Sequence, residues 1–232
     1  MIDVLFNNVL GSSLGIYMRT KPALPAAQEK LQEVDIPGRD GKLVVNTGVY
    51  ESTQIPIEFN YIGPEEKWGK RWRKAKQWLS ALNCEMKFSD DEEVFYKISH
   101  VQINENVKLG NRIGVFEAVF ITKDGLSYLE SGKQECSIDT ILFNPGIVSK
   151  PLYKLFGEGM CKMNVNGVET IVNVSNNIII DAEKMLSYRA DGKSQNTALS
   201  GNYENLYLHP GENIISITNG FQCKVIPNWR CV

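Results

Sequence analysis

Four consecutive carboxylates, from Asp90 to Glu93, are candidates for acid–base chemistry. Glycoside hydrolases cleave sugars with a pair of carboxyl groups, one of which stays protonated in an apolar pocket. Adjacent acids in a polar turn are instead solvated and ionised, and the spacing of Asp90, Asp91, Glu92 and Glu93 does not supply the alternate oxygen ligands of a calcium loop. We interpret the cluster as a solvated turn, with a glycoside hydrolase that uses Asp90 or Glu92 as an alternative hypothesis.

The segment EVDIPGRDGKLVVN, residues 33–46, places an arginine and an aspartate between two glycines. Arg39 and Asp40 could bind an anion or transfer a proton. The Pro37-Gly38 and Asp40-Gly41 dipeptides, however, are typical of tight turns, and apolar residues flank them on both sides. The sequence therefore predicts a strand, a turn and a strand, with a structural role for this segment.

The histidines and cysteines offer little support for nucleophilic or metal chemistry. His100 and His209 are accompanied by no Gly-x-Ser-x-Gly elbow, and the sequence has no glycine-rich phosphate loop. The cysteines are widely spaced, so we expect reduced, partly buried thiols and no zinc site. We expect no catalytic residue, no cofactor and no metal. The five cysteines are Cys84, Cys136, Cys161, Cys223 and Cys231.

Composition is that of a packed globular protein. The chain has 232 residues, of which 43% are hydrophobic, enough for one large or two ordinary domains. A formal charge of −2 gives no general basic surface, so we expect no specific nucleic-acid binding. Asp3 stands where a secretory leader has basic residues, and no apolar run is long enough to span a bilayer. We expect a soluble, non-secreted protein without a membrane partner.

One segment has a clear helical period, and we expect a helix at about residues 64–83. Pro64 suits the first helical position, and Glu65 and Glu66 suit the first turn. Apolar side chains at spacings of three and four predict a stripe that faces the core, with Trp78 on its flank. The stripe consists of Trp68, Trp72, Ala75, Leu79 and Leu82.

The same helix is rich in basic residues, so a membrane-surface or nucleic-acid helix is an alternative interpretation. We favour a helix whose tryptophans pack on a sheet while its basic residues face water or a neighbouring subunit. The basic residues are Lys67, Lys70, Arg71, Arg73, Lys74 and Lys76.

The rest of the chain has the pattern of short strands. Residues 54–59 alternate apolar and polar side chains, and residues 113–122 are apolar on both faces. Asn166-Gly167 lies between two alternating runs and predicts a hairpin. We expect a mainly β protein with an N-terminal β-sandwich-like domain at 1–143, which contains the helix, and a C-terminal jelly-roll sandwich at 144–232.

A sandwich of this kind also suggests a carbohydrate-binding module that contributes to attachment at a host surface. Such modules hold sugars against exposed aromatic rings, and Tyr203, Tyr207 and Trp229 are the candidates. Aromatic residues spread along strands more often belong to a core. This function is therefore the alternative to a purely structural role.

The order of these features resembles the distal tail protein family of long, non-contractile-tailed phages. The resemblance starts at the proline-rich lead-in and the hairpin Ile36–Gly41, and it extends over nearly the whole chain. Its further markers in the first half are Phe59-Asn60-Tyr61, Trp78-Leu79, Lys87-Phe88-Ser89-Asp90-Asp91 and Phe95-Tyr96. Those in the second half are Ser149-Lys150-Pro151, Gly157-Glu158-Gly159, Asn166-Gly167, Ile180-Asp181 and His209-Pro210-Gly211-Glu212-Asn213.

The resemblance implies a structural protein of the virion tail, assembled in the host cytoplasm, with no catalytic residues. Copies of its N-terminal domain would form a ring, typically hexameric, that joins the tail tube to the tip or baseplate and lets DNA pass. A galectin-like C-terminal domain would contact baseplate or receptor-binding components. The partners implied are further copies of the chain, the tail tube protein, a tail-tip or tail-associated protein and a receptor-binding protein.

Overall fold

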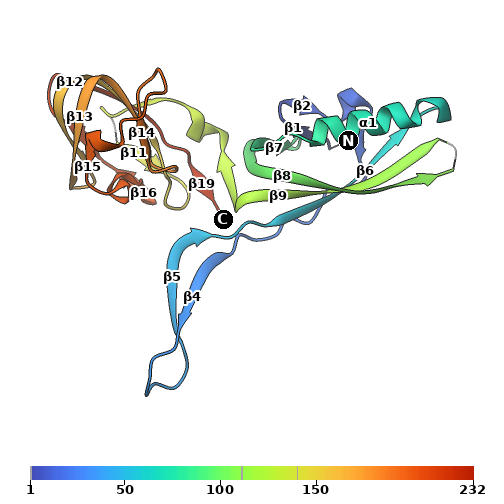
Figure 1. Cartoon of the computed structure of the whole chain (residues 1–232), viewed down its shortest axis with the longest axis horizontal. Coiled ribbons are helices and arrows are strands. Elements are labelled where there is room, and N and C mark those ends of the chain that lie inside the picture. Colours follow the sequence, from blue (N-terminus) through green and yellow to red (C-terminus); the bar gives the residue numbers. More distant parts are fainter. Residues whose placement is uncertain (1, 111, 140) are drawn as a thin grey trace. The chain divides into compact units, whose positions relative to one another are not determined.

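The computed structural model describes residues 2–110, 112–139 and 141–232, and it is mainly β, as predicted (Figure 1). The chain forms two compact units, the first running to Ser127 and the second from Tyr128 to Cys231. The boundary expected near Asn144 lies inside the second unit, because residues 136–137 and 142–144 form strands that pair within that unit.

The first unit is built on one large antiparallel sheet. Its strands follow the order β2-β1-β7-β8-β9-β6-β3, so the long β8 and β9 lie near its middle. Their bounds are β1 Val4–Phe6, β2 Val9–Leu10, β3 Tyr17–Met18, β6 Gln54–Ile62, β7 Cys84–Phe88, β8 Asp91–Leu109 and β9 Ile113–Leu129.

Helix α1, Trp68–Leu79, packs against this sheet, and it is the one α-helix in the described residues. The turn η2, Glu65–Lys67, precedes it, so the predicted helix exists but its α-helical part is shorter than residues 64–83. Leu82 lies beyond its end and is 66% exposed, which contradicts its predicted place in the core stripe. The backbone leaves the helix before Asn83, whose φ of 52° is left-handed.

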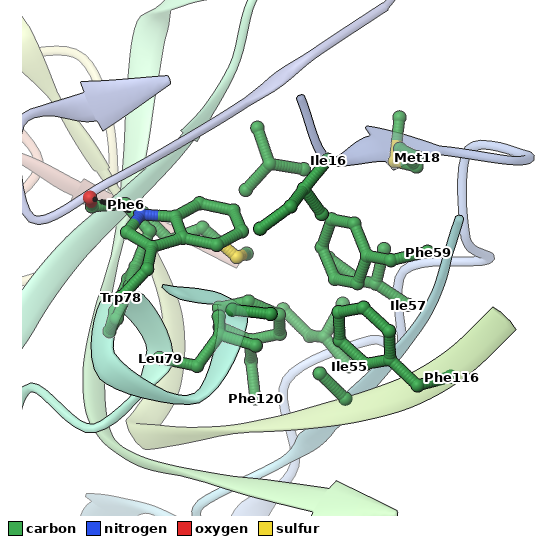
Figure 2. Close-up of a cluster of buried hydrophobic side chains, with 14 of the residues drawn as sticks. Phe6, Ile16, Met18, Ile55, Ile57, Phe59, Trp78, Leu79, Phe116 and Phe120 are labelled. Carbon is green, nitrogen blue, oxygen red and sulfur yellow. Dashed lines mark hydrogen bonds between the residues drawn. The ribbon is translucent and has the colours of Figure 1, made fainter. Parts of the chain in front are cut away.

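Trp78 is the buried tryptophan of this helix, which corrects its predicted position at the flank. Its ring lies edge-on to Phe6 and Phe59, at centroid distances of 6.3 and 5.8 Å, and Figure 2 shows it within the aromatic core. Trp68 and Trp72 are only partly buried against the same core. The helix therefore faces the sheet through Trp78, Leu79 and Ala75.

Two strands of the first unit stand apart from its sheet. β4, Glu29–Val34, and β5, Leu43–Tyr50, pair antiparallel with each other and with no other strand in the described part of the chain. Figure 1 shows them as a separate ribbon. The segment predicted as strand, turn and strand thus forms a hairpin, but a hairpin without a core of its own.

The second unit consists mainly of β strands that pack around a hydrophobic core. The hairpin of β12 and β13 turns at Asn166-Gly167, as predicted, with φ of 52° and 88° and the register Val165↔Val168. The main path runs β10-β18-β12-β13-β14, β15 and β17 join β13 and β12, and β11 pairs with β16. At the end of the chain, β19 pairs with β9, where the Leu129 amide donates to the Trp229 carbonyl.

The remaining elements are short apart from the central hairpin. The strands are β10 Cys136–Ser137, β11 Leu142–Asn144, β12 Leu152–Val165, β13 Val168–Asp181, β14 Leu186–Tyr188, β15 Leu199–Ser200, β16 Gly211–Asn213, β17 Ile215–Ile217, β18 Gln222–Ile226 and β19 Arg230–Cys231. The other 3-10 turns are η1 Ser12–Leu14, η3 Glu130–Lys133, η4 Asn196–Ala198 and η5 Tyr203–Leu206.

Candidate assembly surface

The tip of the β4–β5 hairpin contains the Arg39-Asp40 pair. Both residues are exposed, and they are flanked by Gly38 and Gly41 with φ of 81° and 76°. No atom lies within 4 Å of a Cβ built on either glycine, so backbone conformation alone explains them. The predicted structural role of the tip is consistent with this geometry.

One face of the hairpin is held together by polar contacts. Lys42 Nζ lies 2.7 Å from Glu33 Oε2, and Asn46 Nδ2 donates to Glu29 Oε2. The Tyr50 hydroxyl donates to the other oxygen of Glu29 at 3.2 Å. These contacts join β4 to β5 across the ladder and stabilise the hairpin locally, although each lies in water and contributes little.

The opposite face of the hairpin is apolar and exposed. The ladder pairs Val34 with Leu43 and Gln32 with Val45, which places these four side chains on the face away from the Glu33–Lys42 contact. Every residue from Glu29 to Val49 is exposed. An isolated two-stranded hairpin is at best marginally stable in water, and an exposed apolar cluster commonly marks an interaction site. The large apolar side chains exposed on the hairpin are Leu31, Val34, Ile36, Leu43, Val44, Val45 and Val49.

A second unpaired surface lies at the far end of β8. The registered pairs of β7 with β8 end at Cys84↔Ile98, and the Asn83 amide donates to the Ser99 carbonyl. From Val101 to Leu109, β8 therefore has β9 as its only strand neighbour in the part of the chain described. Val107 and Leu109 are 54% and 49% exposed. The backbone groups on this open edge can pair with another strand.

A groove of about 550 Å³ lies on the sheet across β8, β9 and β6. Val107 and Val115 line it with apolar side chains, and Glu58, Glu105 and Glu117 supply carboxylates. Glu117 accepts a hydrogen bond from Asn104 at 2.6 Å, whereas Glu105 forms no ion pair within the described residues. The groove can thus accept apolar side chains together with a cation.

The four acids are solvated, as the sequence predicts, but only Asp90 lies in a turn, because Asp91, Glu92 and Glu93 begin β8. Lys21 Nζ lies 2.6 Å from Asp90 Oδ2, and this hydrogen bond lowers the pKa of the Asp90 carboxyl. All four acids from Asp90 to Glu93 are exposed. An exposed carboxyl with a lowered pKa is ionised at neutral pH and is poorly suited to act as a general acid.

The basic side of α1 faces water. Lys67, Lys70, Arg73, Lys74 and Lys76 are exposed. Across residues 2–110, 112–139 and 141–232, the helices all lack the length and apolar composition that a membrane-spanning helix needs. The tryptophans turn toward the sheet, which agrees with the interpretation of a helix that packs on strands.

The histidines and cysteines form no shared site in the described chain. His100 Nδ1 lies 2.9 Å from Ser99 Oγ in the first unit, and His209 belongs to the second. Among the described residues, no group of three or more histidine, cysteine or acidic side chains could hold a metal. Burial raises the pKa of the Cys223 thiol to about 12 and also raises that of Cys161. All five cysteines are free, as predicted.

The three aromatic residues considered for sugar binding do not form an exposed platform. Trp229 is buried, and the Tyr203 hydroxyl lies 2.9 Å from Ser187 Oγ. Tyr207 is partly buried, with Lys150 Nζ 5.4 Å from its ring centroid. Two of the three rings thus help to build the second unit, as is usual for aromatic residues in strands.

Sequence reasoning missed the two unpaired surfaces. The signal in the sequence was the run Leu43-Val44-Val45, which is apolar on both faces yet follows a charged strand. Such a run is typical of a strand covered on both sides. It was not evident from the sequence that the covering is absent within the described chain.

The described chain is mainly β and forms two compact units, and the first unit has a detached apolar hairpin and an open sheet edge. The fold is that of the distal tail proteins, as the predicted resemblance implied. The chain is similar to the crystal structure of SPP1 Dit (gp 19.1), described as "a Paradigm of Hub Adsorption Apparatus in Gram-positive Infecting Phages".

The likeness to SPP1 Dit has a TM-score of 0.70 at 14% sequence identity and covers 97% of this chain and 98% of that chain. No protein-family model matches the sequence, and no functionally curated protein matches it. At this identity the comparison establishes the shared fold over both units.

Proposed function

We propose that the chain is a structural component of a phage tail tip or baseplate. The observation that carries the proposal is the fold shared with SPP1 Dit over 97% of the chain. Copies associate into a ring, with six as the expected number, that joins the tail tube to the tip or receptor-binding apparatus and leaves a passage for DNA. The protein acts by binding its neighbours and not by catalysis.

The unpaired surfaces of the first unit support an assembly role. A head-to-tail interface uses two different patches of one chain, and it closes into a ring when the rotation divides the circle. The exposed hairpin and the open β8 edge are two such patches. Assembly would cover apolar side chains that are otherwise costly to expose.

The second unit would bind proteins outside the ring. We propose that it is a galectin-like domain that binds baseplate, tail-tip or receptor-binding proteins, while the first unit binds the tail tube protein and its own copies. The formal charge of −2 is consistent with a passage that does not hold DNA tightly.

The test is the position of the chain in virions. Particles of the phage that encodes the chain are labelled with gold-conjugated antibodies raised against it, and antibodies absorbed with the purified chain serve as control. We expect label at the distal end of the tail. Virions that lack the chain by mass spectrometry, or label on the capsid, would overturn the proposed function.

A further inference from the structure

We infer that the ribbon formed by β11 and β16 in the second unit is a docking surface for a segment of a different tail protein. The segment would carry apolar side chains beside a lysine or an arginine. The inference rests on the proposed function and names the surface through which the second unit binds. It arises from an exposed apolar cluster, here called the ribbon patch, which consists of Ile141, Phe143 and Ile214.

The register of the two strands explains why the ribbon patch faces outward. β11 pairs with β16 through Leu142↔Asn213, and both of these residues are buried. Side chains alternate between the two faces of a strand, so the neighbours of this pair lie on the outer face. Ile141, Phe143 and Ile214 are 56%, 64% and 61% exposed. Large apolar side chains gathered in one exposed cluster commonly mark an interaction site.

A cleft of about 640 Å³ borders the two chain segments that carry the ribbon patch. Residues 135–139, which precede Ile141 in the chain, line one part of it, and residues 215–224, which follow Ile214, line another. Phe156 is also in its lining and is 43% exposed. The volume is in the range of clefts that hold ligands, so the cleft can receive side chains of a segment that lies on the ribbon patch.

The free charges on this surface are negative. Glu212 lies opposite Phe143 in the register, and Asp139 lies in the cleft, and neither carboxylate forms an ion pair within the described residues. Lys224, the cation among the lining residues, already forms an ion pair with Glu135 at 3.3 Å. A partner that brings a lysine or an arginine next to its apolar side chains is therefore complementary to the surface.

The same charges favour a different protein over a second copy as the occupant. A two-fold interface joins a patch to itself, so contact between two ribbon patches would place Glu212 of one copy near Glu212 of the other. Like charges brought together oppose such a contact. The ribbon patch belongs to the second unit, so the first unit is left to bind further copies.

Binding of purified tail proteins to variants of the full chain tests the inference. The probes are the tail-tip protein and the receptor-binding protein of the phage that encodes the chain, each titrated against the immobilised chain. A double variant, Phe143→Ser with Ile214→Ser, removes apolar contacts, and Glu212→Lys reverses a charge. Met185→Ser is the control for the double variant, because Met185 is 46% exposed but follows the far end of β13. Glu92→Lys, at an exposed acid of the first unit, is the control for Glu212→Lys.

We expect one of the probes to bind, with a dissociation constant that rises at least about tenfold in the double variant and in Glu212→Lys, which corresponds to about 1.4 kcal/mol. Met185→Ser and Glu92→Lys should leave the constant unchanged. Higher salt should weaken binding of the unsubstituted chain more than that of Glu212→Gln, because screening acts on the ion pair. The unfolding midpoints of the variants should not change, since the substituted side chains are exposed.

Three results would overturn the inference: unchanged affinity in the double variant and in Glu212→Lys, an equal loss in the two controls, or no binding by either probe. A monomer–dimer equilibrium that the double variant abolishes would overturn it as well, since a second copy would then occupy the ribbon patch. The proposed tail function is tested separately by the label on virions. Label at the distal end of the tail together with any of these results would reject the docking surface alone, whereas virions without the chain would reject the function.

Discussion

The Trp78 indole nitrogen donates a hydrogen bond to the backbone carbonyl of Phe6 at 3.1 Å, across 72 positions of the sequence. This bond ties α1 to β1 inside the core of the first unit, and the two rings meet edge-on. Aromatic rings prefer this edge-to-face geometry, and the N–H group of a buried tryptophan usually has a hydrogen-bond acceptor. The helix is thereby fixed in rotation as well as in position.

Replacing Trp78 by phenylalanine tests this anchor. Trp78→Phe keeps an aromatic ring but leaves the Phe6 carbonyl without its buried donor, so we expect a loss of about 1–3 kcal/mol in the free energy of unfolding. Urea unfolding followed by circular dichroism measures it. Lys74→Ala, on the exposed side of the same helix, should change little. An unchanged midpoint for Trp78→Phe would refute the anchor.

Substitutions at two glycines with left-handed backbone compare the stability of the β4–β5 hairpin with that of the second unit. Gly167 and Gly38 have φ of 88° and 81°, and no atom lies within 4 Å of a Cβ built on either. Gly167→Ala should reduce the free energy of unfolding of the second unit by about 1–2 kcal/mol through backbone strain alone. Gly38→Ala carries the same strain but should not lower the unfolding midpoint of either core.

Hydrogen exchange distinguishes these two outcomes. In Gly38→Ala, faster exchange should be confined to the amides of β4 and β5, because this hairpin pairs with no other strand among the described residues. In Gly167→Ala, the strands of the second unit should all exchange faster. Global destabilisation by Gly38→Ala would mean that the hairpin is part of the core.

Alkaline pH should destabilise the second unit. Burial raises the pKa of the Cys223 thiol from its ordinary 9.0 to about 12, so between these values the folded chain keeps a proton that the unfolded chain releases. The free energy of unfolding therefore falls as pH rises above about 9, by up to about 1.4 kcal/mol per pH unit for one such group. Tyr153 adds to the fall above pH 10, because burial raises its pKa as well.

The contribution of Cys223 is measured by substitution. Cys223→Ala should make the fall in stability between pH 9 and about 11 shallower, whereas Val225→Ala, at a buried side chain of the same strand that does not titrate, should leave the slope unchanged. Denaturant unfolding at half-unit steps of pH provides the slopes. Equal slopes in Cys223→Ala and the unsubstituted chain would contradict the assignment.

Asn213 holds a turn of the second unit together. Its side-chain Nδ2 donates to the backbone carbonyls of His209 and Gly211 at 2.8 and 3.0 Å. Its side-chain Oδ1 accepts a hydrogen bond from Asn166 Nδ2 at 2.8 Å. Asn213 is fully buried. Asn213→Ala removes these hydrogen bonds, whose partners are partly exposed, and should cost about 1–3 kcal/mol. Thermal unfolding should show the loss, with the exposed Asn219→Ala as a neutral control.

Local signals in the sequence predicted the turns and the helix. Asn166-Gly167 and the Gly38–Gly41 segment form turns where expected, because a left-handed backbone requires such residues whatever the surrounding fold. The helix was predicted from its period, but Leu82 and Trp78 were misplaced. The period identifies an apolar stripe, whereas the contacting side chains depend on the sheet beneath it.

Local signals in the sequence did not predict which strands pair with each other. Val34, Leu43 and Val45 have the pattern of a covered strand, yet they are exposed, because β4 and β5 pair only with each other in the described chain. Trp229 presents the reverse case, since a candidate for an exposed sugar platform is buried in the second unit. Burial depends on long-range pairing, which a short stretch of sequence does not specify.

The mass of the purified chain as a function of concentration tests the central claim, that copies assemble through the first unit. Light scattering combined with negative-stain imaging should reveal annular particles with about six times the monomer mass, formed by the chain alone or after addition of the tail tube and tail-tip proteins. A chain that remains monomeric up to millimolar concentration, with and without those proteins, would contradict the account.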